Sequence, residues 1–265
     1  MTKIDDSREV AADILWTSWS EGRKLPDGLP ADVRPQSRAD GYAIQARAQK
    51  KGGAAVFGWK IAATSAGGQK HIGVDGPLAG RLMADRVSQN GEEISLRNNL
   101  MRVAEAEFAF RMKRGLPGTG KPYTVAEVMD AVDTLHPAIE IPDTRYENFS
   151  KVGAPQIIAD NAAAAYFMLG AAAPDTWRTI DLVTHQVKAT VPGKLERIGT
   201  GAVVLGDPRI ALTWLANELV EFGTPLEAGQ VVTTGTCVPP LEIAPGDSFV
   251  NDMGVLGTVT ARFGG

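Results

Sequence analysis

Apolar residues in the first part of the chain recur with the period of a helix. Between Val10 and Trp19 they fall on one helical face, which predicts an amphipathic helix. A second helix is predicted to begin at Ser37 and to end at Gly52-Gly53, because Ser is a preferred N-cap and Gly a preferred C-cap. Together these patterns predict a helical region over residues 1–55.

From Ala54 onward the pattern changes to short apolar segments separated by Gly and Pro, which is typical of strands. The clearest strands are predicted at residues 56–61, 105–111, 231–234 and 255–263. Helices are predicted from Thr124 to the residue before Pro137, from Asp207-Pro208 to Gly223, and over the Ala-rich stretch 162–173 with a start near Asp160. This irregular spacing predicts a mixed α+β fold over residues 56–265 rather than a doubly wound sheet.

Composition and charge narrow the classes of protein. With 44% hydrophobic and 22% charged residues and no apolar run of membrane-spanning length, we expect a soluble protein with no membrane partner. The net charge of -4 and the lack of a Lys/Arg stripe argue against nucleic acid as a partner. The acidic residues 1–6 do not resemble a signal peptide, and the single Cys237 excludes an internal disulfide. These features predict a cytoplasmic protein.

Two glutamates are spaced for a common strand face. In a strand at residues 105–111, Glu105 and Glu107 point to one side, whereas Ala106 and Phe108 point to the other. The two glutamate Cα atoms would lie roughly 6.5 to 7 Å apart, so both carboxylates can reach one cation. Adjacent carboxylates are most often a solvated surface. The apolar opposite face instead favours an interior location, where a bound cation would remove their repulsion.

A third acidic residue stands in a short apolar segment. Glu140 lies within residues 138–141, where it is either an edge-strand residue that faces water or a buried acid that needs a partner. Three carboxylates with positions left open for water and substrate would suit Mg²⁺ or Mn²⁺. The histidines are too scattered along the chain to suggest a metal cluster of their own; they are His71, His136 and His185.

Several short segments, in their order and spacing, carry a family resemblance. They are Gly58-Trp59-Lys60-Ile61, Thr64-Ser65, Gly73-Val74-Asp75, Glu105-Ala106-Glu107-Phe108-Ala109-Phe110, Ile139-Glu140-Ile141, Ala159-Asp160-Asn161-Ala162, Trp214-Leu215-Ala216-Asn217, Gly229-Gln230-Val231-Val232-Thr233-Thr234-Gly235-Thr236, Pro245-Gly246-Asp247 and Gly257-Thr258-Val259. Over these segments the sequence resembles the 2-keto-4-pentenoate hydratase group, with the related oxalocrotonate decarboxylases, in the fumarylacetoacetate-hydrolase-like superfamily.

The resemblance implies a fold and a kind of substrate. It implies a fumarylacetoacetate-hydrolase-like α+β fold, in which a mixed β-roll catalytic domain over residues 56–265 follows a smaller N-terminal helical region over residues 1–55. It also implies a homo-oligomer that acts on a small 2-oxo acid or 2-hydroxydienoate in the catabolism of aromatic compounds.

The resemblance further implies roles for individual residues. The metal, Mg²⁺ or Mn²⁺, would be bound by the residues at the positions of the family's three carboxylates, which are Glu105, Glu107 and Glu140. Lys60 matches the family's lysine and would be the catalytic residue that stabilises an oxyanion or transfers a proton. Substrate-binding segments of the family match those that contain Ser65 and Asp160-Asn161.

The activity implied is that of a lyase, which adds water to a 2-hydroxy-2,4-dienoate through a metal-bound dienolate and gives a 4-hydroxy-2-oxoacid. Hydratases of the family commonly carry an acidic residue where this chain has the stretch 77–81, and Leu78 and Ala79 there are more typical of the decarboxylases. An oxalocrotonate-type decarboxylase is therefore the nearest alternative. The further alternatives are an acylpyruvate-type hydrolase, which normally needs a His-Glu pair, and an inactive partner subunit.

Overall fold

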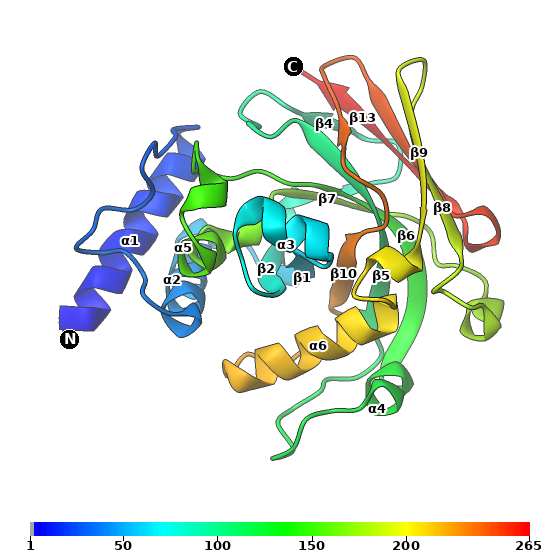
Figure 1. Cartoon of the computed structure of the whole chain (residues 1–265), viewed down its shortest axis with the longest axis horizontal. Coiled ribbons are helices and arrows are strands. Elements are labelled where there is room, and N and C mark those ends of the chain that lie inside the picture. The colour runs from blue at the N-terminus through cyan, green and yellow to red at the C-terminus, as the bar shows by residue number, and fades with distance from the viewer. Residues whose placement is uncertain (1–2) are drawn as a thin grey trace.

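The computed structural model describes residues 3–265, and its strands form two sheets (Figure 1). The larger sheet has the strand order β2-β1-β10-β5-β6-β7-β3, with β11 paired to β5. Its strands are β1 Val56–Ala62, β2 Leu78–Met83, β3 Val87–Gln89, β5 Val103–Met112, β6 Val132–Ile141, β7 Tyr166–Leu169, β10 Val231–Thr236 and β11 Leu241–Glu242. The smaller sheet has the order β4-β13-β12-β8-β9. Its strands are β4 Glu93–Ser95, β8 Gln186–Val191, β9 Leu195–Thr200, β12 Ser248–Asp252 and β13 Thr258–Gly264.

Three helices lie together at the end of the molecule opposite the smaller sheet (Figure 1, left). They are α1 Lys3–Ser20, α2 Arg38–Gly52 and α5 Ala154–Ala159. The predicted start of α2 is confirmed, because the Ser37 side chain accepts a hydrogen bond from the Asp40 N–H. Met1 and Thr2, part of the acidic amino-terminal stretch, lie outside the described residues. The division between residues 1–55 and 56–265 stays a prediction.

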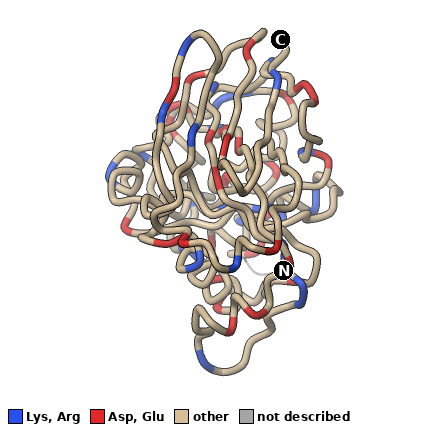
Figure 2. The backbone as a smooth tube through the Cα atoms, turned by 90° about the vertical axis from the view of Figure 1, so that its right-hand side faces the viewer, with Lys and Arg blue, Asp and Glu red and all other residues tan. Residues whose placement is uncertain are grey.

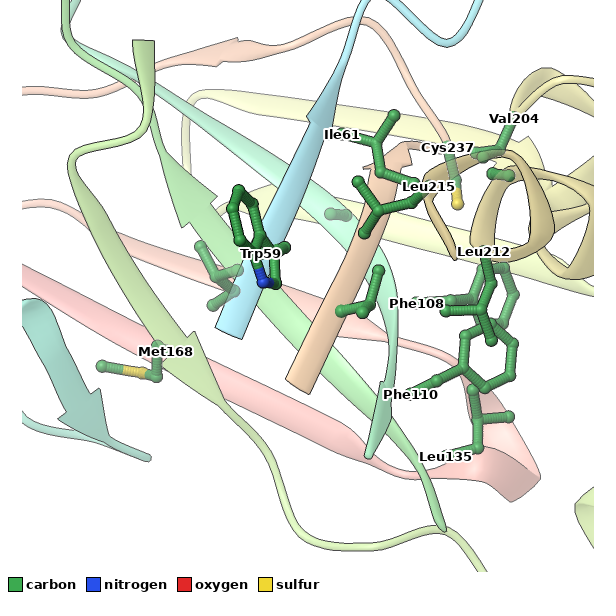
Figure 3. Close-up of a cluster of buried hydrophobic side chains, with 14 of the residues drawn as sticks. Trp59, Ile61, Phe108, Phe110, Leu135, Met168, Val204, Leu212, Leu215 and Cys237 are labelled. Carbon is green, nitrogen blue, oxygen red and sulfur yellow. The ribbon is translucent and has the colours of Figure 1, made fainter. Parts of the chain in front are cut away.

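Helix α6, Pro208–Glu221, explains why one face of β5 is apolar. Figure 3 shows Phe108 and Phe110 of β5 beside Leu212 of this helix, and all three side chains are buried. Burial of aromatic and leucine side chains contributes roughly 1.5 to 3 kcal/mol each. Since side chains alternate along a strand, this packing turns Glu105 and Glu107 to the opposite face of the sheet.

The helix predicted from Thr124 is shorter than expected. Helix α4 covers only Val125–Asp130, and residues 132–141 form strand β6. The predicted Thr124 cap is present, but Pro137 does not end a helix. It lies inside the strand opposite Phe108, and its carbonyl accepts a hydrogen bond from Gly170 N at 2.9 Å. Pairing with β5 on one side and β7 on the other decides the conformation of this segment over its local sequence.

The Ala-rich stretch 162–173 is not a helix. Asp160 ends helix α5, and the next residues form a 3-10 turn in which Asn161, Ala162 and Ala163 have positive φ angles of 57°, 50° and 59°. Strand β7 follows. Left-handed backbone is incompatible with a right-handed helix, so the prediction was wrong here. The strand predicted over residues 255–263 also begins later, at Thr258.

The charged residues do not gather by sign. Figure 2 shows Lys and Arg interspersed with Asp and Glu along the backbone, without a large basic patch in that view. Among residues 3–265, no helix combines the length and the hydropathy that crossing a bilayer requires.

Candidate metal centre and cavity

The three predicted carboxylates meet on neighbouring strands. Glu105 of β5 is the register partner of Glu140 of β6, and Glu107 lies two residues further along β5 on the same face. One carboxylate oxygen from each residue lies within 4.8 Å of one from each of the others. Glu107 and Glu140 are fully buried, whereas Glu105 is partly exposed. The strand pairing thus places three negative charges around one point.

Glu107 is held at one carboxylate oxygen and free at the other. Its Oε2 accepts hydrogen bonds from the Thr233 hydroxyl and from Gly235 N at 2.8 Å. Its Oε1 has no hydrogen-bond partner among the described residues. Burial, followed by the charge of Glu105, raises the pKa of Glu107 to about 8. The arrangement fixes the carboxylate and leaves its second oxygen free to bind a cation.

Lys60 of β1 supplies the one buried cation beside the described carboxylates. Its Nζ lies 3.3 Å from Glu140 Oε2 and donates to the Ala162 carbonyl at 3.2 Å. Burial lowers the pKa of Lys60, but Glu140 and the other two carboxylates outweigh burial and raise it above the ordinary value. Burial also raises the pKa of Glu140 well above its ordinary value, although the charge of Lys60 opposes that shift.

The donor set fits a hard divalent cation. Three carboxylates face one ammonium, and among the described residues neither Glu107 Oε1 nor Glu140 Oε1 has a hydrogen-bond partner. Buried carboxylate oxygens without partners are costly unless a cation or proton occupies the site. Oxygen-only ligands of this kind suit Mg²⁺, Mn²⁺ or Ca²⁺ better than a soft metal. The three residues therefore fit a divalent metal.

A cavity of about 670 Å³ opens next to the carboxylates. Lys60 and Glu105 line its charged end, and the segment from Ala62 to Ser65 forms one wall. Helix α3, Ala66–Ile72, and the 3-10 turn η2, Phe149–Lys151, lie against each other and contribute His71 and Phe149. The ring centroids of His71 and Phe149 are 6.2 Å apart. The centre is thus accessible to a small molecule.

Ser65, predicted to bind substrate, does line this cavity. Its Oγ accepts a hydrogen bond from Gly68 N at 3.0 Å and so forms the N-cap of α3. The hydroxyl keeps its own proton for a further acceptor, because a hydroxyl is both donor and acceptor. Thr64 and Thr236 line the same wall.

Asp160 and Asn161 lie outside the cavity. Asp160 Oδ2 accepts hydrogen bonds from the Thr144 hydroxyl at 2.6 Å and from Arg145 N at 2.7 Å. Asn161 Oδ1 accepts from Arg81 N at 2.7 Å, and its Nδ2 donates to Arg81 O at 2.9 Å. Asn161 thus pairs with β2 as another strand would. Both side chains thus bond to neighbouring protein groups, Asp160 to a hydroxyl and a backbone N–H and Asn161 to backbone, and neither lines the cavity.

Substitution of Asn161 by Ala distinguishes a structural role for this residue from the predicted role in substrate binding. The two hydrogen bonds to Arg81 and the left-handed backbone both favour Asn, so Asn161→Ala is expected to lower the free energy of unfolding by about 2 kcal/mol. The KM of the folded variant is expected to stay unchanged. Urea denaturation and steady-state kinetics measure the two effects, with the exposed Asn148→Ala as the control. A raised KM with unchanged stability would restore the predicted substrate contact.

The lone cysteine and two of the three histidines lie in structural positions. Cys237 is buried in the main hydrophobic cluster, and His136 and His185 bond to the Gly170 and Met253 carbonyls. Leu78 and Ala79, which replace the acid expected of a hydratase, are fully buried in β2. Among the described residues lining the cavity, only Lys60, Glu105 and His71 have an acidic or basic side chain.

Three supporting residues were not assigned a role from the sequence. Thr233 and Gly235 donate to Glu107, and Asn251 of β12 donates to the Glu107 carbonyl at 3.3 Å and to the Ala138 carbonyl at 2.8 Å. Gly235 has a φ of 104°, and a Cβ there would collide with the Thr64 side chain. A sequence signal for Thr233 existed, because a hydroxyl in a buried strand needs an acceptor.

Adjacent threonines offer a matched test of this support. Thr233 donates to the Glu107 carboxylate, whereas Thr234, equally buried, donates to the Phe108 carbonyl at 3.2 Å. Thr233→Val is expected to weaken Mn²⁺ binding by about 10- to 100-fold, as loss of a bond to a metal ligand typically does. Thr234→Val is expected to leave it unchanged. Calorimetric titration compares them, and equal affinities would contradict a role for Thr233.

The fold and the carboxylate site define a family. The family model of the fumarylacetoacetate (FAA) hydrolase C-terminal region matches residues 78–264. The chain belongs to the fumarylacetoacetate hydrolase family, and the predicted α+β fold of that family is confirmed.

Within the family, hydratases and a decarboxylase are similar to this chain. The 2-keto-4-pentenoate hydratase of Burkholderia vietnamiensis is 36% identical over 225 residues, which cover 84% of each sequence. The TodF product hydratase of Pseudomonas putida is 36% identical over 274 residues, which cover 99% of each. A solved structure of 4-oxalocrotonate decarboxylase from Pseudomonas putida G7, complexed with magnesium and adipate, has a TM-score of 0.87 at 29% identity and covers 99% of this chain and 98% of that chain.

Proposed function

We propose that this protein is a divalent-metal-dependent hydratase that adds water to a 2-hydroxy-2,4-dienoate. The observation that carries the proposal is the cluster of Glu105, Glu107 and Glu140 beside Lys60, at the end of a cavity large enough for a small organic acid. The similarity to hydratases over nearly the whole chain supports the same reaction. The product would be a 4-hydroxy-2-oxoacid, as in the breakdown of aromatic compounds.

The protein's own residues bind and orient the substrate. When bound to the three carboxylates, a divalent ion supplies Lewis-acid stabilisation of negative charge at the substrate's 2-oxygen. Lys60 Nζ places a second positive charge next to the same position and is the buried group able to move a proton there. Ser65 lines the same cavity, and its hydroxyl proton is available to a substrate carboxylate bound there. Overall, water supplies a proton to the far carbon of the diene and a hydroxyl to its neighbour, while the enol proton of the 2-hydroxyl is replaced by a proton at carbon 3, which gives the 2-oxo group.

Decarboxylation of a 4-oxalocrotonate-like diacid is the second candidate. It is favoured by Leu78 and Ala79, because the described part of the chain has no acid at these positions to activate water. It is also favoured by the decarboxylase relatives and structures. Both reactions need the same stabilised dienolate oxygen, so the metal centre alone does not separate them.

Product analysis distinguishes the two reactions. Purified protein with Mg²⁺ would be incubated separately with 2-hydroxypenta-2,4-dienoate and with 4-oxalocrotonate in H₂¹⁸O. A hydratase incorporates ¹⁸O at the 4-hydroxyl of the product from the first substrate. Release of carbon dioxide from the second substrate, without hydration of the first, would overturn the hydratase assignment in favour of the decarboxylase.

We further propose that the protein uses Mg²⁺ in the cell, forms a homo-oligomer and is located in the cytoplasm. Oxygen ligands and the magnesium-complexed decarboxylase structure support Mg²⁺. Light scattering of the purified protein would test the oligomeric state, and a monomer at working concentration would contradict it.

A further inference from the structure

The wall of the cavity changes from charged to apolar within one step along two paired strands. Glu105 and Glu140 face each other across β5 and β6. Two residues further in the same direction, Val103 and Pro142 line the cavity. Two residues of strand span roughly 6.5 to 7 Å, so the apolar surface begins within a few carbon–carbon bonds of a small acid held at the carboxylates. A substrate held at the carboxylates therefore extends along an apolar surface.

Among the described residues, none that lines the outer part of the cavity is a buried cation. Besides Val103 and Pro142, its lining includes Met101, Phe149 and Ile157. Apolar side chains of this kind stabilise hydrocarbon and give a carboxylate no partner, so a charged group there loses its hydration without compensation.

The cations that do line the cavity do not change this conclusion. The Lys60 ammonium lies at the charged end, where it is paired with Glu140 at 3.3 Å. His71, the other described lining residue able to carry positive charge, is exposed on helix α3. A carboxylate beside an exposed charge stays hydrated, and such surface pairs contribute little affinity.

The size of the cavity also exceeds the need of a five-carbon acid. Its volume is about 670 Å³. Cavities of roughly 300 to 1,000 Å³ are typical of sites that enclose drug-sized molecules. The volume thus leaves room for a substituent on the diene.

We propose that the substrate carries an uncharged hydrocarbon tail, alkyl or aryl, and no second carboxylate, and that Met101, Val103, Phe149 and Ile157 form the site for this tail. The proposal rests on the proposed function, because the reaction places the 2-oxygen and carboxylate at the glutamates. It names the class of substrate that the cavity selects: monoacids with an apolar end are bound in preference to diacids.

Binding of unreactive 2-oxo acids tests the proposal without turnover. The Mg²⁺-saturated protein would be titrated by calorimetry with 2-oxohexanoate, with 2-oxoadipate, which has the same number of carbons but ends in a carboxylate, and with 2-oxooctanoate. We expect 2-oxoadipate to bind at least about tenfold more weakly than 2-oxohexanoate, because its second carboxylate is desolvated without a partner. Each added methylene of 2-oxooctanoate is expected to tighten binding by about fourfold. A Kd for 2-oxoadipate equal to or below that for 2-oxohexanoate would overturn the proposal.

A variant pair tests the assigned position of the tail. Met101 is partly exposed and lies outside strand β5, so a lysine of similar length is compatible with the fold. Met101→Lys is expected to shift the ratio of the two Kd values towards 2-oxoadipate by at least about tenfold, the effect of pairing a charge in an apolar site. Met101→Gln, which is polar but neutral, is expected to leave the ratio unchanged. A ratio unaffected by Met101→Lys in a variant with the wild-type circular dichroism spectrum would contradict the placement.

A failure of the tail-site proposal can be told apart from a failure of the proposed reaction. If 2-hydroxypenta-2,4-dienoate, which has no tail, is not hydrated, the proposed function fails whatever the Kd ratio is. If it is hydrated while the diacid binds as tightly as the monoacid, only the tail site is wrong.

Discussion

Substitution of Glu107 by Gln is expected to abolish metal binding and to lower kcat/KM by at least about 10³-fold. The amide keeps the size of the side chain and can still accept the hydrogen bonds of Thr233 and Gly235, but it removes a negative charge from the cluster. Lewis-acid stabilisation contributes several kcal/mol, and each 1.36 kcal/mol changes a rate about tenfold. Calorimetric titration with Mn²⁺ and initial rates with 2-hydroxypenta-2,4-dienoate measure the two effects.

Stability distinguishes this loss from unfolding. Glu107 is a fully buried carboxylate with a pKa raised by burial, so a neutral isostere is expected to leave the melting temperature of the metal-free protein unchanged or higher. The increase in melting temperature caused by Mn²⁺ should disappear. Glu242→Gln, an exposed change on the neighbouring strand β11, is the matched control and should behave as wild type. Unchanged turnover of Glu107→Gln would refute the metal assignment.

Substitution of Lys60 by Met is expected to move turnover and metal affinity in opposite directions. The loss of the ammonium removes a proton-transfer group and an oxyanion contact, which together are expected to lower kcat by about 10²- to 10⁴-fold. The same change removes a positive charge 3.3 Å from Glu140, so the carboxylates repel one another more and attract a divalent cation more strongly. The affinity for Mn²⁺ is therefore expected to rise several-fold.

The opposite changes in kcat and in Mn²⁺ affinity make the test specific, because disruption of the site would lower both. Lys188→Met on β8 removes a half-exposed lysine paired with Glu196 and serves as the control. Lys60→Met with normal kcat would show that Lys60 has no catalytic role. A fall in metal affinity would show instead that Lys60 supports the ligands structurally.

The metal cluster was predictable because its geometry follows from local rules. The period of two along a strand placed Glu105 and Glu107 on one face before any tertiary contact was known. Glu140 stands out as a lone acid in a short apolar segment, and the family resemblance assigned it to the same metal and added Lys60. The structure brings all four together through pairing of β5 with β6 and of β1 with β10.

The errors arose where tertiary contacts override local preference. Alanine favours helix, yet residues 161–163 adopt left-handed backbone because Asn161 pairs with Arg81 of β2. Residues 132–141 form a strand through their neighbours on both sides. The support of Glu107 by Thr233 and Asn251 depends on chain segments more than a hundred positions away, as the separations of 126 and 144 show. The local sequence around Glu107 cannot predict hydrogen-bond partners so far away along the chain.

The bond from Asn251 also has a consequence for how the protein matures. The ligand strands β5 and β6 are complete at residue 141, whereas the group that ties their backbones together arrives 144 positions after Glu107. During synthesis from the amino terminus, the glutamate ligands therefore emerge from the ribosome long before Asn251. Contacts between such distant segments form slowly. The nascent chain therefore passes through a stage in which β5 and β6 are present but Asn251 does not yet bond to their carbonyls. We expect high-affinity metal binding only at the end of folding.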